Sequence, residues 1–141
     1  MQLTKYTDLS LRVLMHLAVF PSELGTVKDI AQRHNVSRNH LMKVVHRLSS
    51  LGYIESIQGR GGGIALALAP EDIVVGAIVR DMEATLDVID CAASKCPLRP
   101  ACLLKPALDR AGKAFVDTLD GYTIADLTRN RAQIVKLVGF R

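Results

Sequence analysis

Apolar residues recur at helical spacing in the first third of the chain, and this pattern predicts two consecutive helices. The first helix is expected over residues 7–20, with Thr7 as the cap of its first turn. A break that contains Pro and Gly separates it from the second helix. The second helix is expected to begin after Thr26 and to end near 34–35. Asp29, three residues after this cap, resembles the acidic partner of a capping box.

A third helix is predicted directly after the second, with Ser37 as its N-cap and Gly52 as its stop. Its apolar side consists of Leu41, Val44, Val45, Leu48 and Leu51. Its opposite, polar side consists of Arg38, Asn39, Lys43, His46 and Arg47. Two short helices joined by a tight turn, the second basic on its outer side, predict a helix-turn-helix at about 26–51.

Two extended runs follow this motif, at 53–58 and 64–69, and the second alternates apolar and small positions. The glycine-rich segment 59–63 lies between them and carries Arg60. The pattern therefore predicts a β-hairpin with a mobile, cationic tip, which would serve as the wing beside the helix-turn-helix.

Beyond Pro70, the pattern predicts a helix over 73–82, then a loop over 88–102 that contains all the cysteines. A longer helix follows, with Pro106 in its first turn, and Thr123 can cap a short last helix. The long helix carries an apolar stripe: Leu104, Leu108, Ala111, Phe115 and Leu119. The predicted fold is mainly α, a winged helix-turn-helix with a small β-hairpin, a cysteine loop and a long helix.

Three regions are expected along the chain. Residues 1–69 form the DNA-binding region, 70–128 hold the cysteine loop and long helix within the same domain, and 129–141 form a C-terminal tail. The charge follows this division, because residues 1–69 carry eight Lys and Arg against four Asp and Glu, whereas 70–141 carry ten of each. A basic first half suits a polyanion as partner.

The composition, 49% hydrophobic and 23% charged, is typical of a globular protein. The sequence contains no run of about 20 apolar residues and no pattern of a signal peptide at its start, so we expect a cytoplasmic protein with no membrane partner. It offers no nucleophile paired with a base and no substrate-cradling motif, and its four His residues all precede residue 47. An enzyme is therefore not predicted.

The start of the third helix carries side chains that suit the DNA major groove. Arg can form two hydrogen bonds with guanine and Asn with adenine, whereas Ser and Lys suit phosphate. The predicted DNA-contacting residues are Ser37, Arg38, Asn39, His40, Lys43, Thr26, Lys28 and Arg60. Arg60, between glycines, would enter a narrow minor groove. The alternative is an amphipathic helix with a merely solvated face, and His40 suits either a DNA contact or solvent.

The cysteines Cys91, Cys96 and Cys102 are separated by four and five residues. An odd, clustered set in a chain without an export signal is not typical of a disulfide framework. Thiolates at such gaps can wrap an iron–sulfur cluster, whereas zinc usually shows closer pairs and a fourth Cys or His. A cluster, a zinc ion and redox thiols all remain open on spacing alone, and the fourth ligand is not defined.

Four segments resemble the bacterial iron–sulfur winged-helix repressors: 3–12, 36–45, 59–63 and the cysteine loop that ends at 96–102. The resemblance runs from residue 1 to about 128. It implies a homodimer in which the helix near 103–119 packs against its twin and the dimer binds an inverted-repeat operator. It also implies an iron–sulfur cluster on the three cysteines.

Within this family the sequence is most similar to the nitric-oxide-sensitive repressors. The branch that regulates cluster assembly has a His ligand three residues after the third cysteine, and this chain has Lys105 there. In the nitric-oxide-sensitive branch an Asp near the N-terminus ligates the cluster across the dimer, and the matching position is Asp8. The resemblance favours a [4Fe–4S] cluster, with [2Fe–2S] as the alternative. If Asp8 is not a ligand, it stabilises the first helix through the helix dipole.

The resemblance thus implies a repressor that releases its operator when nitric oxide attacks the cluster, so that genes for nitric oxide detoxification are expressed. One alternative is a related regulator that senses redox state, iron or the supply of clusters. A more distant alternative is a zinc-stabilised protein-interaction module.

Overall fold

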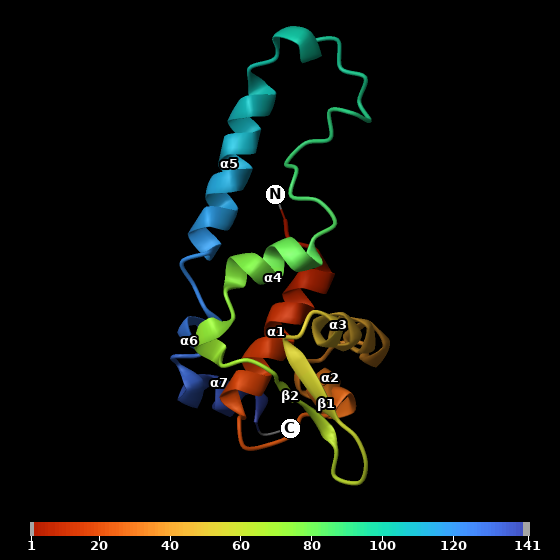
Figure 1. Cartoon of the computed structure of the whole chain (residues 1–141), viewed down its shortest axis with the longest axis vertical. Coiled ribbons are helices and arrows are strands. Elements are labelled where there is room, and N and C mark those ends of the chain that lie inside the picture. The colour runs from red at the N-terminus through yellow and green to blue at the C-terminus, as the bar shows by residue number, and fades with distance from the viewer. Residues whose placement is uncertain (1, 140–141) are drawn as a thin grey trace.

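A computed structural model describes residues 2–139 as a mainly helical chain with one two-stranded antiparallel sheet (Figure 1). The elements in chain order are α1 (Lys5–Val19), α2 (Val27–Arg33), α3 (Arg38–Ser50), β1 (Ile54–Ile57), β2 (Gly63–Leu66), a 3-10 turn (Pro70–Asp72), α4 (Val75–Met82), a second 3-10 turn (Arg99–Ala101), α5 (Leu104–Leu119), α6 (Ile124–Leu127) and α7 (Arg131–Val138). The order agrees with the predicted winged helix-turn-helix, cysteine loop and long helix.

Helix α1 begins earlier than the sequence predicted. Its N-cap is Thr4, whose hydroxyl accepts a hydrogen bond from the backbone N–H of Thr7 at 3.3 Å. The prediction of Thr7 as the cap is therefore wrong. Its side chain is 0% exposed and its hydroxyl donates to Glu83, 76 residues further on, at 2.6 Å. A partner so distant in sequence leaves no local pattern.

The two helices of the helix-turn-helix begin at the predicted caps. The hydroxyl of Thr26 accepts from the N–H of Asp29 at 3.1 Å, and Ser37 caps α3 in the same way. The predicted reciprocal bond of Asp29 is not formed, because its carboxylate pairs with Arg33 at 2.9 Å instead. Asn35 has a φ of 53° in the turn between the helices, a backbone conformation that Asn tolerates.

The hairpin is shorter than predicted. Strand β1 pairs with β2 from Ile54 opposite Leu66 to Ile57 opposite Gly63. The predicted second run reached residue 69, but β2 ends at Leu66, and Leu68 is 44% exposed. Alternation alone did not show that the chain leaves the sheet here to enter the 3-10 turn at Pro70.

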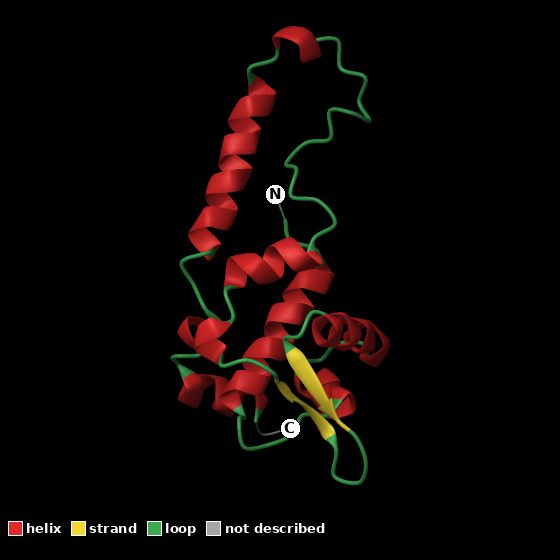
Figure 2. Cartoon of the chain, in the orientation of Figure 1, coloured by secondary structure: helices red, strands yellow, loops and turns green. Residues whose placement is uncertain are grey.

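Helix α1 lies at the centre of the molecule (Figures 1 and 2). It packs against α3, α4, α6, α7 and strand β2. The largest side chains with almost no exposed surface include Leu9, Leu14, Ile30, Leu41, Leu48, Ile73, Ile78 and Ile124. One continuous core therefore joins the helix-turn-helix to α4 and α6, across the predicted boundary at residue 69.

Helix α5 stands away from this body, and the cysteine segment runs along one side of it (Figure 1). Pro106 lies in its first turn, as predicted. Only Gly112 and Val116 of this helix are buried, whereas Leu104 is 60% exposed and Phe115 is 37% exposed. The predicted apolar stripe is thus largely uncovered within one chain.

The chain ends in two short helices on the α1 side of the core. Thr123 caps α6 in a full capping box, because its hydroxyl accepts from the N–H of Asp126 and the Asp126 carboxylate accepts from its backbone N–H. Helix α7 follows within the region for which the sequence predicted only a tail. Arg33 of α2 donates to the carbonyls of Val138 and Gly139 at 3.1 and 3.0 Å. Among residues 2–139, no helix is long and apolar enough to span a membrane.

Candidate nucleic-acid interface and metal centre

The N-terminal half of α3 presents a polar surface to solvent. Leu41, Val44 and Leu48 point into the core and fix the rotation of the helix. The residues on the other side are exposed: Ser37, Arg38, Asn39, His40 and Lys43. Because the core side is fully packed, these side chains remain available for a groove of DNA, where such a helix is read from its N-terminal turns.

The two other predicted contacts on the helix-turn-helix lie at the start of α2. Thr26 and Lys28 are both exposed. The hydroxyl of Thr26 already accepts a backbone N–H as the helix cap, so its hydroxyl proton is the group left for a phosphate oxygen. Lys28 adds a positive charge on the same turn.

Arg60 lies at the tip of the hairpin, between two glycines whose backbone few other residues could adopt. Gly59 has a φ of 96° and Gly61 a φ of 76°. A Cβ on Gly62 would lie 2.2 Å from the carbonyl oxygen of Ile57, so this position also requires glycine. The glycines therefore bend the loop tightly and leave the exposed Arg60 without bulky neighbours in the sequence. The hairpin projects from the same side of the body as α2 and α3 (Figure 2).

The three cysteines line one pocket of about 440 Å³ between the cysteine segment and the first turns of α5. Each is partly exposed, and their thiols are free. The Sγ atom of Cys102 accepts a hydrogen bond from the backbone N–H of Lys105 at 3.4 Å. The Asp90 carboxylate holds the turn after Cys91, since it accepts from the N–H groups of two successive residues at 3.0 Å.

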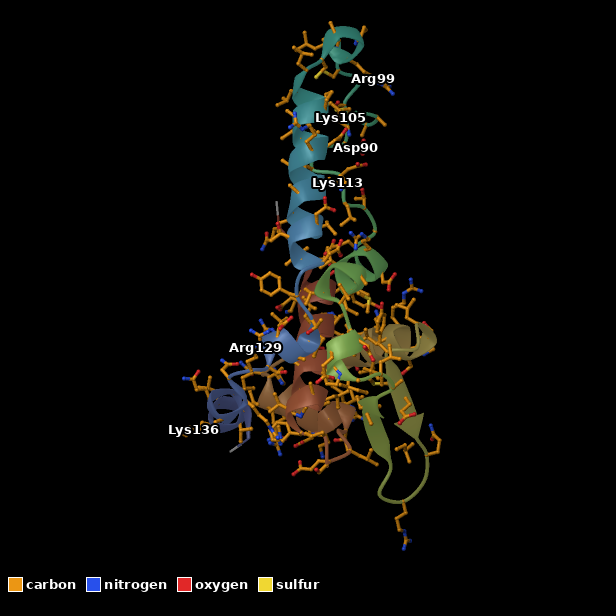
Figure 3. All side chains as sticks on the ribbon, turned by 60° about the vertical axis from the view of Figure 1, so that its left-hand side comes forward. Asp90, Arg99, Lys105, Lys113, Arg129 and Lys136 are labelled. Carbon is orange, nitrogen blue, oxygen red and sulfur yellow. The ribbon has the colours of Figure 1, made fainter. Side chains whose placement is uncertain are left out.

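Charged side chains surround this pocket. Arg99 and Lys105 contribute positive charge to the lining, together with the carboxylates Asp87, Asp90 and Asp109. Figure 3 shows Asp90, Arg99 and Lys105 beside the upper part of α5, with Lys113 further along the helix. The hydrogen bond between Lys105 and Asp109 raises the pKa of the Lys105 amine, so this cation persists at neutral pH.

The donor set that this pocket offers to a metal group is three thiols. Within residues 2–139, no three His, Cys, Asp or Glu side chains converge as ligands of a single ion. The thiols instead surround a shared space. Thiolates are the ligands that iron–sulfur clusters prefer, and N–H···S hydrogen bonds such as that of Cys102 stabilise thiolate charge. The residues present therefore fit an iron–sulfur cluster with three cysteine ligands.

Asp8 is not part of this pocket within one chain. It lies in the first turns of α1 and forms an ion pair with Arg12 at 2.9 Å. The pocket residues all come from 87–109. The structure thus brings together the three cysteines but leaves Asp8 apart from them.

Several polar residues with long-range partners gave no sequence signal. The Nδ1 of His16 lies 3.1 Å from the Nε2 of His34, and burial is the main cause that lowers the pKa of His16 to about 4. Asp81 and Glu83, at the end of α4, bind residues of α1 and α3 and also Tyr53, which directly precedes β1. Sequence separations of 18 to 79 residues hide such pairs from any local pattern.

A helix-turn-helix followed directly by a β-hairpin, all on one core, defines a winged-helix DNA-binding protein. The sequence matches the Rrf2 family, described as iron-dependent transcriptional regulators, over residues 3–130. The chain belongs to this family and is a transcriptional regulator.

Relatives match the chain along nearly its whole length. It is 49% identical to the HTH-type transcriptional regulator NsrR of Bacillus subtilis (strain 168), over 98% of this chain and 97% of that protein. Among solved structures, IscR of T. potens has a TM-score of 0.75 at 25% identity and covers 92% of this chain and 88% of its own. CymR, the global cysteine regulator of B. subtilis, has a TM-score of 0.72 at 26% identity and covers 90% and 95%.

Proposed function

We propose that this regulator is a repressor that senses nitric oxide through an iron–sulfur cluster. The observation that carries the proposal is the pocket lined by Cys91, Cys96 and Cys102, in a chain whose other end is a basic winged helix. The choice of nitric oxide as the sensed molecule rests on the relatives named NsrR and on the resemblance to nitric-oxide-sensitive repressors. The protein would act in the cytoplasm, without a membrane partner and without enzymatic activity.

The cluster would be held by the three cysteines and by Asp8 of a second copy of the chain. Asp8 lies outside its own cysteine pocket, so a ligand role requires the dimer. A [4Fe–4S] core is favoured, with [2Fe–2S] as the alternative. When bound, the cluster supplies iron that reacts with nitric oxide. Lys105 and Arg99 offset the negative charge of the thiolates.

A homodimer would read an inverted-repeat operator in double-stranded DNA. The uncovered apolar stripe of α5 offers a surface for the twin helix. A two-fold dimer places its reading helices in successive major grooves, about one helical turn apart. The proposed DNA contacts are Ser37, Arg38, Asn39, His40, Lys43, Thr26, Lys28 and Arg60, all of which are exposed.

The division of the chain follows from these roles. Residues 1–69 would bind DNA, 70–128 would hold the cluster and the dimer contact, and 129–141 would be the tail. A cluster ligated by both copies fixes the spacing of the two reading helices. The cluster then stabilises the dimer arrangement that binds DNA more than the arrangement that does not. Loss of that ligation releases the operator, and genes for nitric oxide detoxification are expressed.

A second candidate function is a sibling regulator that senses redox state, iron or cluster supply. The similarity of the backbone to T. potens IscR favours it. The two functions differ in the treatment that releases DNA. A zinc-stabilised interaction module, the more distant alternative, would bind zinc alone and no duplex.

The cluster proposal is tested by replacing Cys91, Cys96 or Cys102 with Ala and reconstituting each variant with iron and sulfide without oxygen. Each variant should lose the visible absorbance of the loaded protein, while Ser94→Ala, an exposed position in the same loop, should keep it. Cysteine variants with the wild-type spectrum would exclude these ligands.

The signal is tested by titrating the loaded protein with nitric oxide and measuring operator binding. The nitric oxide sensor is supported if a few equivalents of nitric oxide per cluster release the operator DNA, while an iron chelator applied under the same conditions does not. Release by chelation or oxidation alone supports the sibling regulator. Asp8→Ala should shorten the lifetime of the cluster. An unchanged lifetime would mean that Asp8 is not a ligand and only forms its ion pair with Arg12.

A further inference from the structure

The end of α4 is bonded to α1 by one carboxylate. The Oε1 atom of Glu83 accepts three hydrogen bonds: from the backbone N–H of Thr4 at 2.7 Å, from its hydroxyl at 3.0 Å, and from the hydroxyl of Thr7 at 2.6 Å. Burial raises the pKa of Glu83, but these hydrogen bonds outweigh it and hold the pKa below its ordinary value. The Glu83 carboxylate therefore fixes the end of α4 to the start of α1, where Asp8 directly follows Thr7 in the sequence.

Two residues earlier, Asp81 bonds the same end of α4 to the DNA-reading elements. The hydroxyl of Tyr53, at the base of the hairpin, donates to the Asp81 carboxylate at 2.7 Å. Arg47 of α3 donates to the Asp81 backbone carbonyl at 3.4 Å. Burial, then the bond to Asp81, raise the pKa of Tyr53 to about 12, so its phenol keeps the proton that this bond needs.

These contacts meet at one point of the chain. Glu83 is the residue that follows α4, and the segment from there to α5 carries the cysteines. The root of the cysteine segment is thus joined to α1 on one side, and to the hairpin and α3 on the other.

We propose that Asp81 and Glu83 are positioning residues that couple the start of α1 and the root of the cysteine segment to the reading helix and the hairpin. This inference rests on the proposed function, in which Asp8 responds to the state of a cluster. A displacement at Asp8 moves its neighbour Thr7, and through the hydrogen bond of Thr7 it moves Glu83 and the end of α4. The end of α4 then moves Tyr53 and Arg47, which are bonded to Asp81. The Glu83 contacts and the Asp81 contacts act in series, so weakening either set weakens the route.

Each half of the route can be weakened by removing one hydroxyl and keeping the shape of the side chain. Thr7→Val removes the hydrogen bond from Thr7 to Glu83 and leaves the two from Thr4. Tyr53→Phe removes the hydrogen bond from the base of the hairpin to Asp81. Tyr122→Phe is the matched control, because Tyr122 is 47% exposed and lies outside the route. None of these residues belongs to the proposed DNA contacts or ligands.

The measurement is the ratio of operator Kd between cluster-free and cluster-loaded protein, at matched salt. Thr7→Val and Tyr53→Phe should each reduce this ratio by about threefold or more, with cluster content unchanged. The double variant should lose less than the product of the two single effects, since the two sets of contacts act in series. Ratios equal to that of Tyr122→Phe, or losses that multiply in the double variant, would overturn the route.

Hydrogen exchange of the cluster-free protein gives a second readout that needs no cluster. Thr7→Val should speed exchange about fivefold at the first turn of α1 and also at the base of β1. Faster exchange at α1 alone would overturn the link. If wild-type protein binds the operator equally with and without cluster, the proposed sensor function fails, and this exchange measurement still decides whether the two ends of the route are coupled.

Discussion

At the residue scale, the histidines show how position changes the chemistry of one side chain. His40 and His46 lie on the exposed side of α3, whereas His16 is 4% exposed and contacts His34. Both histidines have lowered pKa values, because partial or full burial disfavours the charged imidazole and neighbouring cations such as Arg33 add repulsion. The sequence shows four histidines, and the fold brings His16 of α1 against His34 at the end of α2, which lowers the pKa values of both.

Stability should therefore fall on mild acidification. The pKa of His16 is about 4 in the folded chain against 6.5 ordinarily, so between these values the unfolded chain binds a proton that the folded chain does not. Stability then rises with pH across this window and is lost as pH falls through it, by on the order of 2 kcal/mol. Urea unfolding at about pH 7 and about pH 4.5 measures this difference in the free energy of unfolding. His16→Gln should show a smaller difference between the two values, and parallel curves would exclude His16 as the cause.

Arg60 is predicted to enter a narrow minor groove of DNA from the hairpin tip. Arg60→Ala should weaken operator binding and lower the slope of log Kd against log salt by about one, because one fewer counterion is released. Glu55→Ala, an exposed change at the strand before the tip, is the control. Equal affinity and slope in Arg60→Ala would place the wing away from the DNA.

At the element scale, local caps and stops decided helix boundaries wherever the cap's partners are close in sequence. Thr26, Ser37 and Thr123 cap the helices that the sequence assigned to them. At the start of α1, Thr4 and Thr7 can both cap a helix, and the structure uses Thr4, whereas Thr7 is buried against Glu83. Strand β2 ends before the predicted residue 69, because the chain leaves the sheet ahead of the 3-10 turn at Pro70 although the alternation continues.

The stop of α3 gives a test at this scale. Gly52 has a φ of 83°, and a Cβ there would meet no atom within 4 Å, so the cost of a side chain is one of backbone conformation alone. Gly52→Ala should lower the free energy of unfolding by about 1 kcal/mol, and Gly52→Asn by less, because Asn tolerates this conformation. Urea unfolding distinguishes them. An alanine variant as stable as wild type would show that the turn relaxes.

At the scale of the whole molecule, α5 is the element that one chain leaves incomplete. Only Gly112 and Val116 of this helix are buried, while its apolar stripe is largely uncovered. An apolar helix side of this kind is typical of an interface. In the proposed dimer this stripe, the cysteine pocket and Asp8 all meet the second copy.

Phe115→Asp should therefore raise the dimer dissociation constant by about tenfold or more, since it would bury an unpaired carboxylate. Analytical ultracentrifugation over a dilution series measures this constant. Lys113→Asp places the same carboxylate on α5 outside the stripe and should leave the dimer intact. A dimer that tolerates the change at Phe115 would have its interface elsewhere.

The sequence by itself determined the local features of this protein: helices α1 to α6 and the hairpin, the basic side of α3, the glycine-flanked Arg60 and the spacing of the three cysteines. Each depends on residues close together in the chain, through helical periodicity, caps and backbone freedom at glycine. Only the tertiary structure decided which distant residues meet. It buried Thr7 against Glu83, paired His16 with His34, and turned the cysteines into one pocket while leaving Asp8 outside it. These contacts follow from the packing of α1 at the centre of the core, and no local pattern encodes them.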